Sequence, residues 1–188
     1  MDALMAALVA AALAQMGDRP AWLAAILSDR YRAPGLVIAM AALALLGAGL
    51  LAAAAGALLA PRLTPEAKQL FLALALLFQG GGALFPVKAP DRLSRWRIGA
   101  AATSFVGLFI LAFGDGVQFV VLALAARAEL PWLAAIGATL GSLAAIATAA
   151  ILGEAGWTAL PLVALRRGIA ILFAAAALWL GLGALRLI

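Results

Sequence analysis

The fold class is decided by an apolar run that one polar segment interrupts, ALMAALVAAALAQMGDRPAWLAAILS at residues 3–28. The part before Gly17, residues 3–16, rises only about 21 Å as a helix, whereas the hydrocarbon core of a membrane is about 30 Å thick. A helical span must therefore continue through Gly17-Asp18-Arg19-Pro20. This continuation predicts that the Asp18 carboxylate lies well inside the hydrocarbon.

The composition excludes a soluble domain. Of the 188 residues, 68% are apolar and 11% are charged, against roughly 45–50% and 25% in soluble proteins. A small soluble domain could not bury so much apolar surface, and there is too little charge for a disordered chain. The sequence has no Cys and no His, which excludes disulfides, zinc sites of the Cys/His type and Ser-His-Asp catalysis. We therefore expect a membrane protein without an enzymatic activity or a permanently bound cofactor.

Continuous Ala/Leu-rich stretches predict an all-α integral membrane protein with six transmembrane helices. The connections are short, so residues 1–188 form one membrane domain. The predicted spans are residues 3–28, 34–60, 66–86, 97–126, 131–153 and 163–187. Apolar faces all round are compatible with a homo-oligomer and mark no dimer surface.

The distribution of Lys and Arg predicts the orientation. The first, third and fifth loops carry eight of these residues: Arg30, Arg32, Lys88, Arg92, Arg95, Arg97, Arg166 and Arg167. The other two loops and the C-terminus carry four: Arg62, Lys68, Arg127 and Arg186. The positive-inside rule then places both termini outside and the central loop in the cytoplasm, in a bacterial plasma membrane. The net charge of +5 thus reports topology and not nucleic-acid binding.

The two halves of the chain resemble each other. A shift of 97 residues aligns Gly17-Asp18 with Gly114-Asp115, and also Arg30 with Arg127 and Pro34 with Pro131. The sequence therefore predicts two three-helix repeats, residues 1–87 and 97–188, joined by a cytoplasmic linker at 88–96. An odd number of spans inverts the second repeat in the membrane, an architecture typical of secondary transporters.

The aligned Gly-Asp pairs mark the candidate site. Each carboxylate lies at a similar depth in its span, so Asp18 and Asp115 should approach each other near the midplane. Helix breaks are predicted at Gly17, Pro20, Gly114 and Gly116, because Gly and Pro loosen a helix. A buried carboxylate in a membrane is costly and is a functional hypothesis by default. For Asp18 the alternative is a structural kink in which it pairs with Arg19 or a backbone amide.

Two glutamines share the helix faces of these acids. Gln15 precedes Asp18 by three residues, and Gln118 follows Asp115 by three. Each amide oxygen is a candidate ligand for a cation, with an interhelical hydrogen bond as the alternative. Arg19 is either a charge of the site or snorkels to the cytoplasmic face.

At these residues the sequence resembles a known family. Gln15-Met16-Gly17-Asp18-Arg19-Pro20 and Ala112-Phe113-Gly114-Asp115-Gly116-Val117-Gln118 resemble the paired Glu-x-Gly-Asp-Lys/Arg-Ser/Thr motifs of the transmembrane protein 165 and Gdt-one family, a relative of LysE-type exporters. The resemblance covers nearly the whole chain. It implies exchange of Mn²⁺ or Ca²⁺ for protons, with the motif acids as ligands.

The motifs depart from the family pattern at several positions. Gln15 and Ala112 stand where the family has Glu, Pro20 and Val117 where it has Ser or Thr, and Gly116 replaces the second base. Two carboxylates and one arginine then leave the expected site with a net charge of −1, instead of −2 for two complete motifs. This charge is poor for a divalent cation unless Arg19 points away, because such cations favour several carboxylate oxygens.

The sequence thus predicts a secondary transporter that exports Mn²⁺, or also Ca²⁺, in exchange for protons. Asp18 and Asp115 would hold the metal when ionised and protons otherwise, so that the two cations compete. The expected partners are the inorganic cation, protons and the lipid bilayer, without nucleic acid. Two alternatives remain open: a non-transporting scaffold or partner subunit of the same fold, and a transporter retuned to a monovalent or organic cation.

Overall fold

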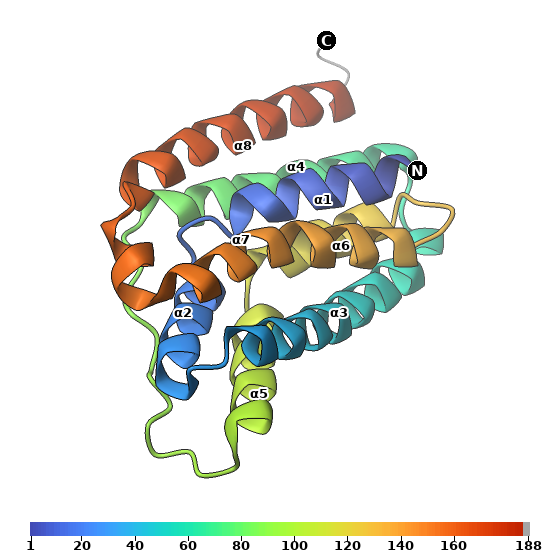
Figure 1. The fold of residues 1–188 in the computed structure, drawn as a ribbon. Coiled ribbons are helices and arrows are strands. Elements are labelled where there is room, and N and C mark those ends of the chain that lie inside the picture. The colour runs from blue at the N-terminus through green and yellow to red at the C-terminus, as the bar shows by residue number, and fades with distance from the viewer. Residues whose placement is uncertain (186–188) are drawn as a thin grey trace.

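The computed structural model describes residues 1–185, and this part of the chain is built from α-helices without a strand (Figure 1). This confirms the all-α prediction. The helices, including one short 3-10 helix, are α1 (Asp2–Ala14), α2 (Arg19–Tyr31), α3 (Pro34–Leu59), η1 (Ala60–Arg62), α4 (Pro65–Leu84), α5 (Ala100–Phe113), α6 (Gly116–Ala125), α7 (Trp132–Ala159) and α8 (Leu162–Ala184).

Four of the helices are long and apolar enough to cross a membrane: α3 together with η1, α4, α7 and α8. The pair α5 and α6 is bent by 68° and makes a fifth if it counts as one span. The predicted span at 3–28 falls on two separate helices, α1 and α2, which are not among these four or five candidate spans. The predicted span at 163–187 corresponds to α8, and its residues 186–187, like Ile188 of the second repeat, lie outside the described residues.

The helix boundaries follow local sequence signals. Pro20, Pro34 and Pro65 each lie in the first two positions of a helix, where proline costs no hydrogen bond. Pro20 therefore starts α2 and does not itself break a helix. Thr64 caps α4 by accepting a hydrogen bond from the Ala67 N–H at 3.2 Å. Within α7, a kink at Gly153 with φ of +69° coincides with the predicted end of the fifth span, but the helix continues to Ala159.

The core is alanine-rich and lies in two clusters. One contains Ala7, Ala75, Val121, Ala135 and Phe173 and joins α1, α3, α4, α6, α7 and α8. The other joins α2, α3, α5 and α7, with Leu23, Leu108 and Ile146 fully buried in it. Small side chains allow these helices to approach closely, which is the usual basis of helix association in membranes.

The helix contacts connect the two halves of the chain. Helices α1 and α2 pack against α7, while α5 and α6 pack against α3; α1 also contacts α6, and α2 contacts α5. Helices α3 and α7 contact each other, as do α4 and α8. The packing of α4 against α6 has no comparable counterpart between α8 and α2 within residues 1–185.

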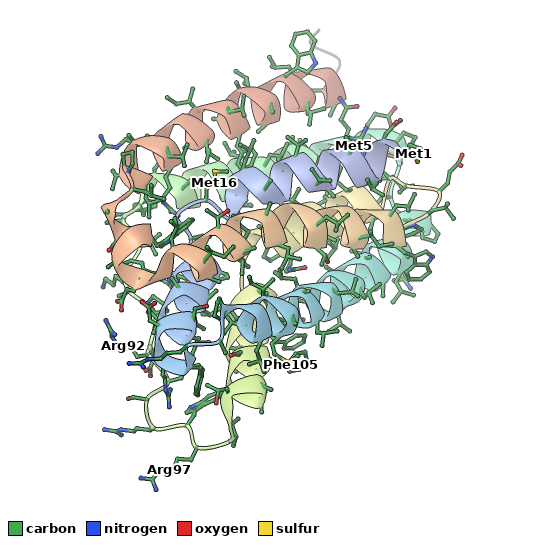
Figure 2. All side chains as sticks on the ribbon, viewed as in Figure 1. Met1, Met5, Met16, Arg92, Arg97 and Phe105 are labelled. Carbon is green, nitrogen blue, oxygen red and sulfur yellow. The ribbon has the colours of Figure 1, made fainter. Side chains whose placement is uncertain are left out.

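The segment between α4 and α5 carries much of the charge. The labelled Arg92 and Arg97 lie at the end of the molecule where this segment runs (Figure 2). The Arg30 guanidinium donates to the carbonyl of Leu93 at 2.8 Å, and Arg92 pairs with Glu154 at 2.6 Å. The Asp29 carboxylate accepts a hydrogen bond from the Glu154 N–H at 2.7 Å, just after the kink in α7. These bonds tie α2 and α7 to the segment.

Candidate functional site

The first break, between α1 and α2, places Asp18 at the N-terminus of α2. Asp18 is the N-cap residue in extended conformation, and its Oδ1 accepts a hydrogen bond from the Arg19 N–H at 2.8 Å. The chain reaches this position through Gly17, whose φ of +79° is a conformation that side chains disfavour. Both interpretations of Asp18 therefore have a structural counterpart: the carboxylate binds a backbone amide and also lines a cavity.

The second break, between α5 and α6, repeats this arrangement. Asp115 is the N-cap residue of α6, also in extended conformation, and follows Gly114 at the C-cap of α5. Its Oδ2 accepts a hydrogen bond of 2.7 Å from Nε2 of Gln15, which lies at the end of α1. Residues from the two halves of the chain are thus in direct contact at the site.

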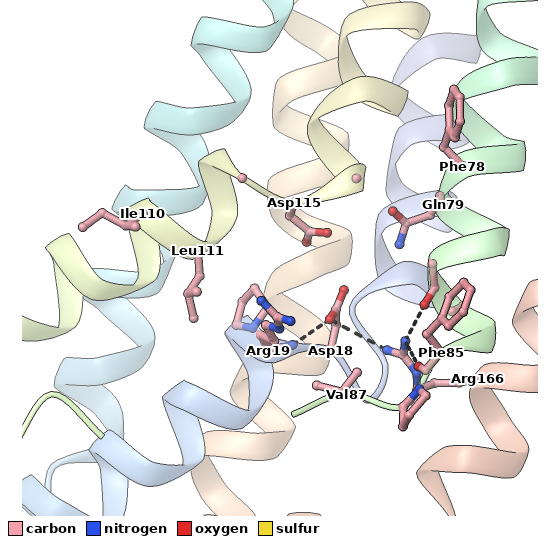
Figure 3. Close-up of a pocket in the computed structure, with 16 residues that line it drawn as sticks. Asp18, Arg19, Phe78, Gln79, Phe85, Val87, Ile110, Leu111, Asp115 and Arg166 are labelled. Carbon is pink, nitrogen blue, oxygen red and sulfur yellow. Dashed lines mark hydrogen bonds and ion pairs between the residues drawn. The ribbon is translucent and has the colours of Figure 1, made fainter. Parts of the chain in front are cut away.

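A cavity of about 390 Å³ contains both carboxylates (Figure 3). Asp18 and Asp115 line it together with Arg19, Gln79 and Arg166, and Figure 3 shows the two acids on facing sides of the opening. Pro20, Gly114 and Gly116 of the predicted helix breaks also line it. The remaining walls are mainly apolar, from the ends of α4 and α5 and from residues 85–87.

The predicted glutamines differ in their roles. Gln15 is 1% exposed, and its Oε1 has no partner among the described residues. Gln118 does not line the cavity; it lies in the first turn of α6, where its N–H donates to the Asp115 carbonyl at 3.1 Å. Gln15 does not line the cavity either, but it contacts Asp115 through its hydrogen bond. The Oε1 of Gln118 is also buried without a partner among the described residues.

Gln79 on α4 lines the cavity, although in the sequence it is merely a polar residue late in a span. It lies beside one of the positions that depart from the family pattern. A side chain at position 116 would meet the Gln79 amide, so a base at this position would require the flexible Gln79 side chain to move aside. Ala112, at a glutamate position of the family, is fully buried in the core beside α2 and α3.

Arg166 is the residue that the sequence did not reveal. It was counted in the fifth loop, but α8 begins at Leu162, so Arg166 lies one turn inside a helix and is 8% exposed. Its guanidinium donates to the carbonyls of Gly17 and Gly82, each at 3.1 Å, and lies 3.8 Å from Asp18 Oδ1. Pro161 directly before α8 was the available signal, because proline favours helix starts.

Arg166 corrects the expected charge of the site. The cavity is lined by two carboxylates and two guanidinium groups, those of Arg19 and Arg166, so its formal charge is zero and not −1. Arg19 is exposed and stands among the lining residues. Among residues 1–185 no group of three or more His, Cys, Asp or Glu could hold a metal ion.

The arrangement offers oxygen ligands to a cation. The carboxylates of Asp18 and Asp115 and the unpartnered Oε1 of Gln15 are hard donors of the kind that Mn²⁺ and Ca²⁺ accept. Among the carbonyls at the ends of α1 and α5, those of Leu13 and Ala112 accept hydrogen bonds from the N–H groups of Met16 and Asp115, at 3.1 and 3.2 Å. Broken helices at the site are typical of cation sites in transporters.

Comparison with known proteins gives two findings. A family model described as "Divalent cation/proton antiporter GDT1" matches residues 3–91 and 100–187. The chain is also 32% identical over 175 residues to a protein of Vibrio cholerae serotype O1 named "Putative manganese exporter", covering 92% of this chain and 87% of that protein. No solved structure matches the chain.

Proposed function

Because the chain belongs to the GDT1 family of divalent cation/proton antiporters, we propose that it exports Mn²⁺ in exchange for protons through a site built on Asp18 and Asp115. The observation that carries this proposal is the shared cavity: two carboxylates, one from each half of the chain, begin the second helix of two broken pairs. The relative from Vibrio cholerae carries the name "Putative manganese exporter", which favours Mn²⁺ over Ca²⁺.

The chemistry of exchange follows from the two acids. Ionised Asp18 and Asp115, with the Gln15 amide oxygen and helix-end carbonyls, bind the divalent cation; protonated acids do not. Protons and metal therefore compete for the same oxygens, and the site carries one or the other across the membrane. Motion of one half of the chain against the other would expose the site to each side in turn.

The proposed architecture is six spans in two inverted repeats, residues 1–87 and 97–188 with the linker 88–96. The family model matches two segments that correspond to these repeats. The packing also repeats between the halves. Helices α1 and α2 of the first half pack on α7 of the second, and α5 and α6 of the second half pack on α3 of the first. In Figure 1 the start of α1 and the end of α8 lie at the same end of the molecule, as an even number of crossings requires.

The proposed orientation keeps the segment between α4 and α5 in the cytoplasm. Because Arg166 lies in α8 and not in the fifth loop, seven basic residues remain on the cytoplasmic side against four on the other. The charge bias therefore persists. Arg186, one of the four, lies outside the described residues. The cavity is bordered by residues 85–87 at the start of this segment. We infer that the site faces the cytoplasm here, from which a cation to be exported would enter.

Single cysteines test this orientation cleanly, because the chain has no cysteine of its own. Ser94→Cys lies in the segment between α4 and α5, and Glu129→Cys lies between α6 and α7; both positions are exposed. In intact cells a membrane-impermeant maleimide should label the second variant and spare the first. The reverse labelling pattern would contradict the proposed orientation.

A second candidate is a transporter of a monovalent or organic cation. The observation that favours it is the balance of two carboxylates by two guanidinium groups in the cavity, since a neutral site attracts a divalent cation weakly. The choice between the candidates rests on whether Arg166 leaves Asp18 when the cation binds.

The deciding experiment is Mn²⁺ flux into proteoliposomes under an imposed pH gradient, with Asp18→Asn and Asp115→Asn beside the native protein. We expect gradient-driven flux in the native protein and none in either variant. Flux that persists in both variants would refute the two-carboxylate site. Absence of flux from well-folded native protein would favour the second candidate, to be tested with monovalent cations, or a non-transporting scaffold.

A further inference from the structure

The buried guanidinium of Arg166 requires a role, because a charged side chain is rarely buried without a partner. It donates to the carbonyls of Gly17, Gly82 and Phe85, at 3.1, 3.1 and 3.3 Å. These acceptors are neutral and satisfy its hydrogen-bonding groups without cancelling its charge. The counter-charge is the Asp18 carboxylate at 3.8 Å.

The pairing with Asp18 is close but loose. At 3.8 Å the two groups attract each other without the short bonds of a bidentate arginine–carboxylate pair. The Asp18 carboxylate keeps 20% of its side chain exposed to the cavity, whereas Arg166 keeps 10%. An incoming cation can therefore reach Asp18 from the cavity, where Arg166 lies beside it (Figure 3).

We propose that Arg166 is a built-in counter-cation, which neutralises Asp18 while the site is empty and yields Asp18 to the transported cation. This inference rests on the proposed function and adds the residue that limits cation affinity. A transported ion must bind well enough to enter and weakly enough to leave. The fixed positive charge of Arg166 weakens binding at Asp18 and so speeds release.

Arg166 also connects the charge of Asp18 to the packing of three elements. The Gly17 carbonyl belongs to the break between α1 and α2, and the carbonyls of Gly82 and Phe85 belong to the end of α4. Arg166 itself extends from α8. A cation on Asp18 pushes the guanidinium away from the break, which loosens the tie of α8 to α1 and α2.

Asp115 has a different neighbour. It accepts a hydrogen bond from the neutral Gln15, and no ion pair to it is formed within residues 1–185. Arg166 therefore acts on one of the two acids, and its removal should change the affinity of the site without removing a ligand.

The test is Mn²⁺ affinity of the purified full-length protein, measured by equilibrium dialysis for the native chain and four variants. Arg166→Gln and Arg166→Met remove the charge, and the second keeps the test valid if the first folds poorly. Arg166→Lys keeps the charge without the planar group, and Arg167→Gln changes the exposed neighbour. We expect the two charge-removing variants to bind Mn²⁺ about ten-fold tighter or more, Arg166→Lys to gain less affinity than either because its charge remains, and Arg167→Gln to bind like the native protein.

Transport kinetics separate this role from a purely structural one. In proteoliposomes Arg166→Gln should lower both the half-saturating Mn²⁺ concentration and the maximal rate, because release becomes slow. A residue that only holds the fold would lower the rate without any gain in affinity.

The outcomes test the counter-cation role of Arg166 separately from the proposed Mn²⁺ transport. If the native protein and Arg167→Gln bind Mn²⁺ but neither charge-removing variant binds tighter, the counter-cation role is wrong and the proposed function stands. If none of these proteins binds Mn²⁺, both are overturned.

Discussion

The two broken helix pairs are alike at their aspartates but differ in their chemical surroundings. In each, an aspartate preceded by a glycine caps the second helix in extended conformation, with φ of −96° at Asp18 and −87° at Asp115. Their neighbours differ: Asp18 lies beside the guanidinium of Arg166, whereas Asp115 accepts a hydrogen bond from Gln15. The repeated backbone thus holds one charge-balanced and one unbalanced carboxylate.

This difference indicates that the two halves contribute unequally to cation binding. Helix N-termini favour a carboxylate in both breaks, so the backbone does not distinguish them. The side chains around each acid do: a cation must compete with Arg166 for Asp18 but meets no such competitor at Asp115. The unbalanced carboxylate should therefore dominate affinity.

The largest expected effect is on Asp115. Changing a residue that only supports a metal ligand typically costs roughly 10–100-fold in affinity. Asp115→Asn removes a ligand itself and should reduce Mn²⁺ affinity by more than this. Asp18→Asn should cost less, because the native protein gives up the Asp18–Arg166 interaction when the cation binds. Equilibrium dialysis of both variants checks this order. Equal losses would mean that Arg166 does not offset Asp18.

Restoring the family glutamate should strengthen Mn²⁺ binding in the first half of the chain and destabilise the protein in the second. Gln15→Glu is nearly isosteric and adds a carboxylate next to Asp115, 2.7 Å from the present amide nitrogen; we expect about ten-fold tighter Mn²⁺ binding. Ala112→Glu instead places a charge in a fully buried core position and should cost about 3–5 kcal/mol of stability. Thermal unfolding and dialysis separate these effects. A well-folded Ala112→Glu protein with tighter binding would show that position 112 reaches the site.

The sequence predicted the all-α fold, both breaks and the Gly-Asp pairs, because these depend on local signals. Long apolar runs, proline at helix starts and glycine at sharp turns act within a few residues. The contact between Gln15 and Asp115 joins positions 100 residues apart, and the repeat predicted only that Asp18 and Asp115 approach each other. What could not be predicted is which side chains from α4 and α8 turn into the cavity.

Arg166 and Gln79 illustrate that limit. A short segment rich in polar residues, Glu154 to Arg167, resembles a loop by composition, yet α7 extends to Ala159 and α8 begins at Leu162. The buried position of Arg166 depends on carbonyls from Gly17 and Gly82, in two other parts of the chain. No local pattern encodes such a set of acceptors, and therefore the charge of the site was predicted incorrectly.

The smallest expected effect compares the two glycines that precede the acids. Gly17 has φ of +79°, and an added Cβ would lie 3.1 Å from the Arg166 side chain. Gly17→Ala should therefore cost about 1–2 kcal/mol, or a fall in Tm of about 2–4 °C per kcal/mol. Gly114 has φ of −88°, and its nearest neighbour would be 3.7 Å away. Gly114→Ala should thus stay within about 0.5 kcal/mol of the native protein. Thermal unfolding in detergent measures both, and a matching fall in Tm for Gly114→Ala would contradict the expected difference between the two breaks.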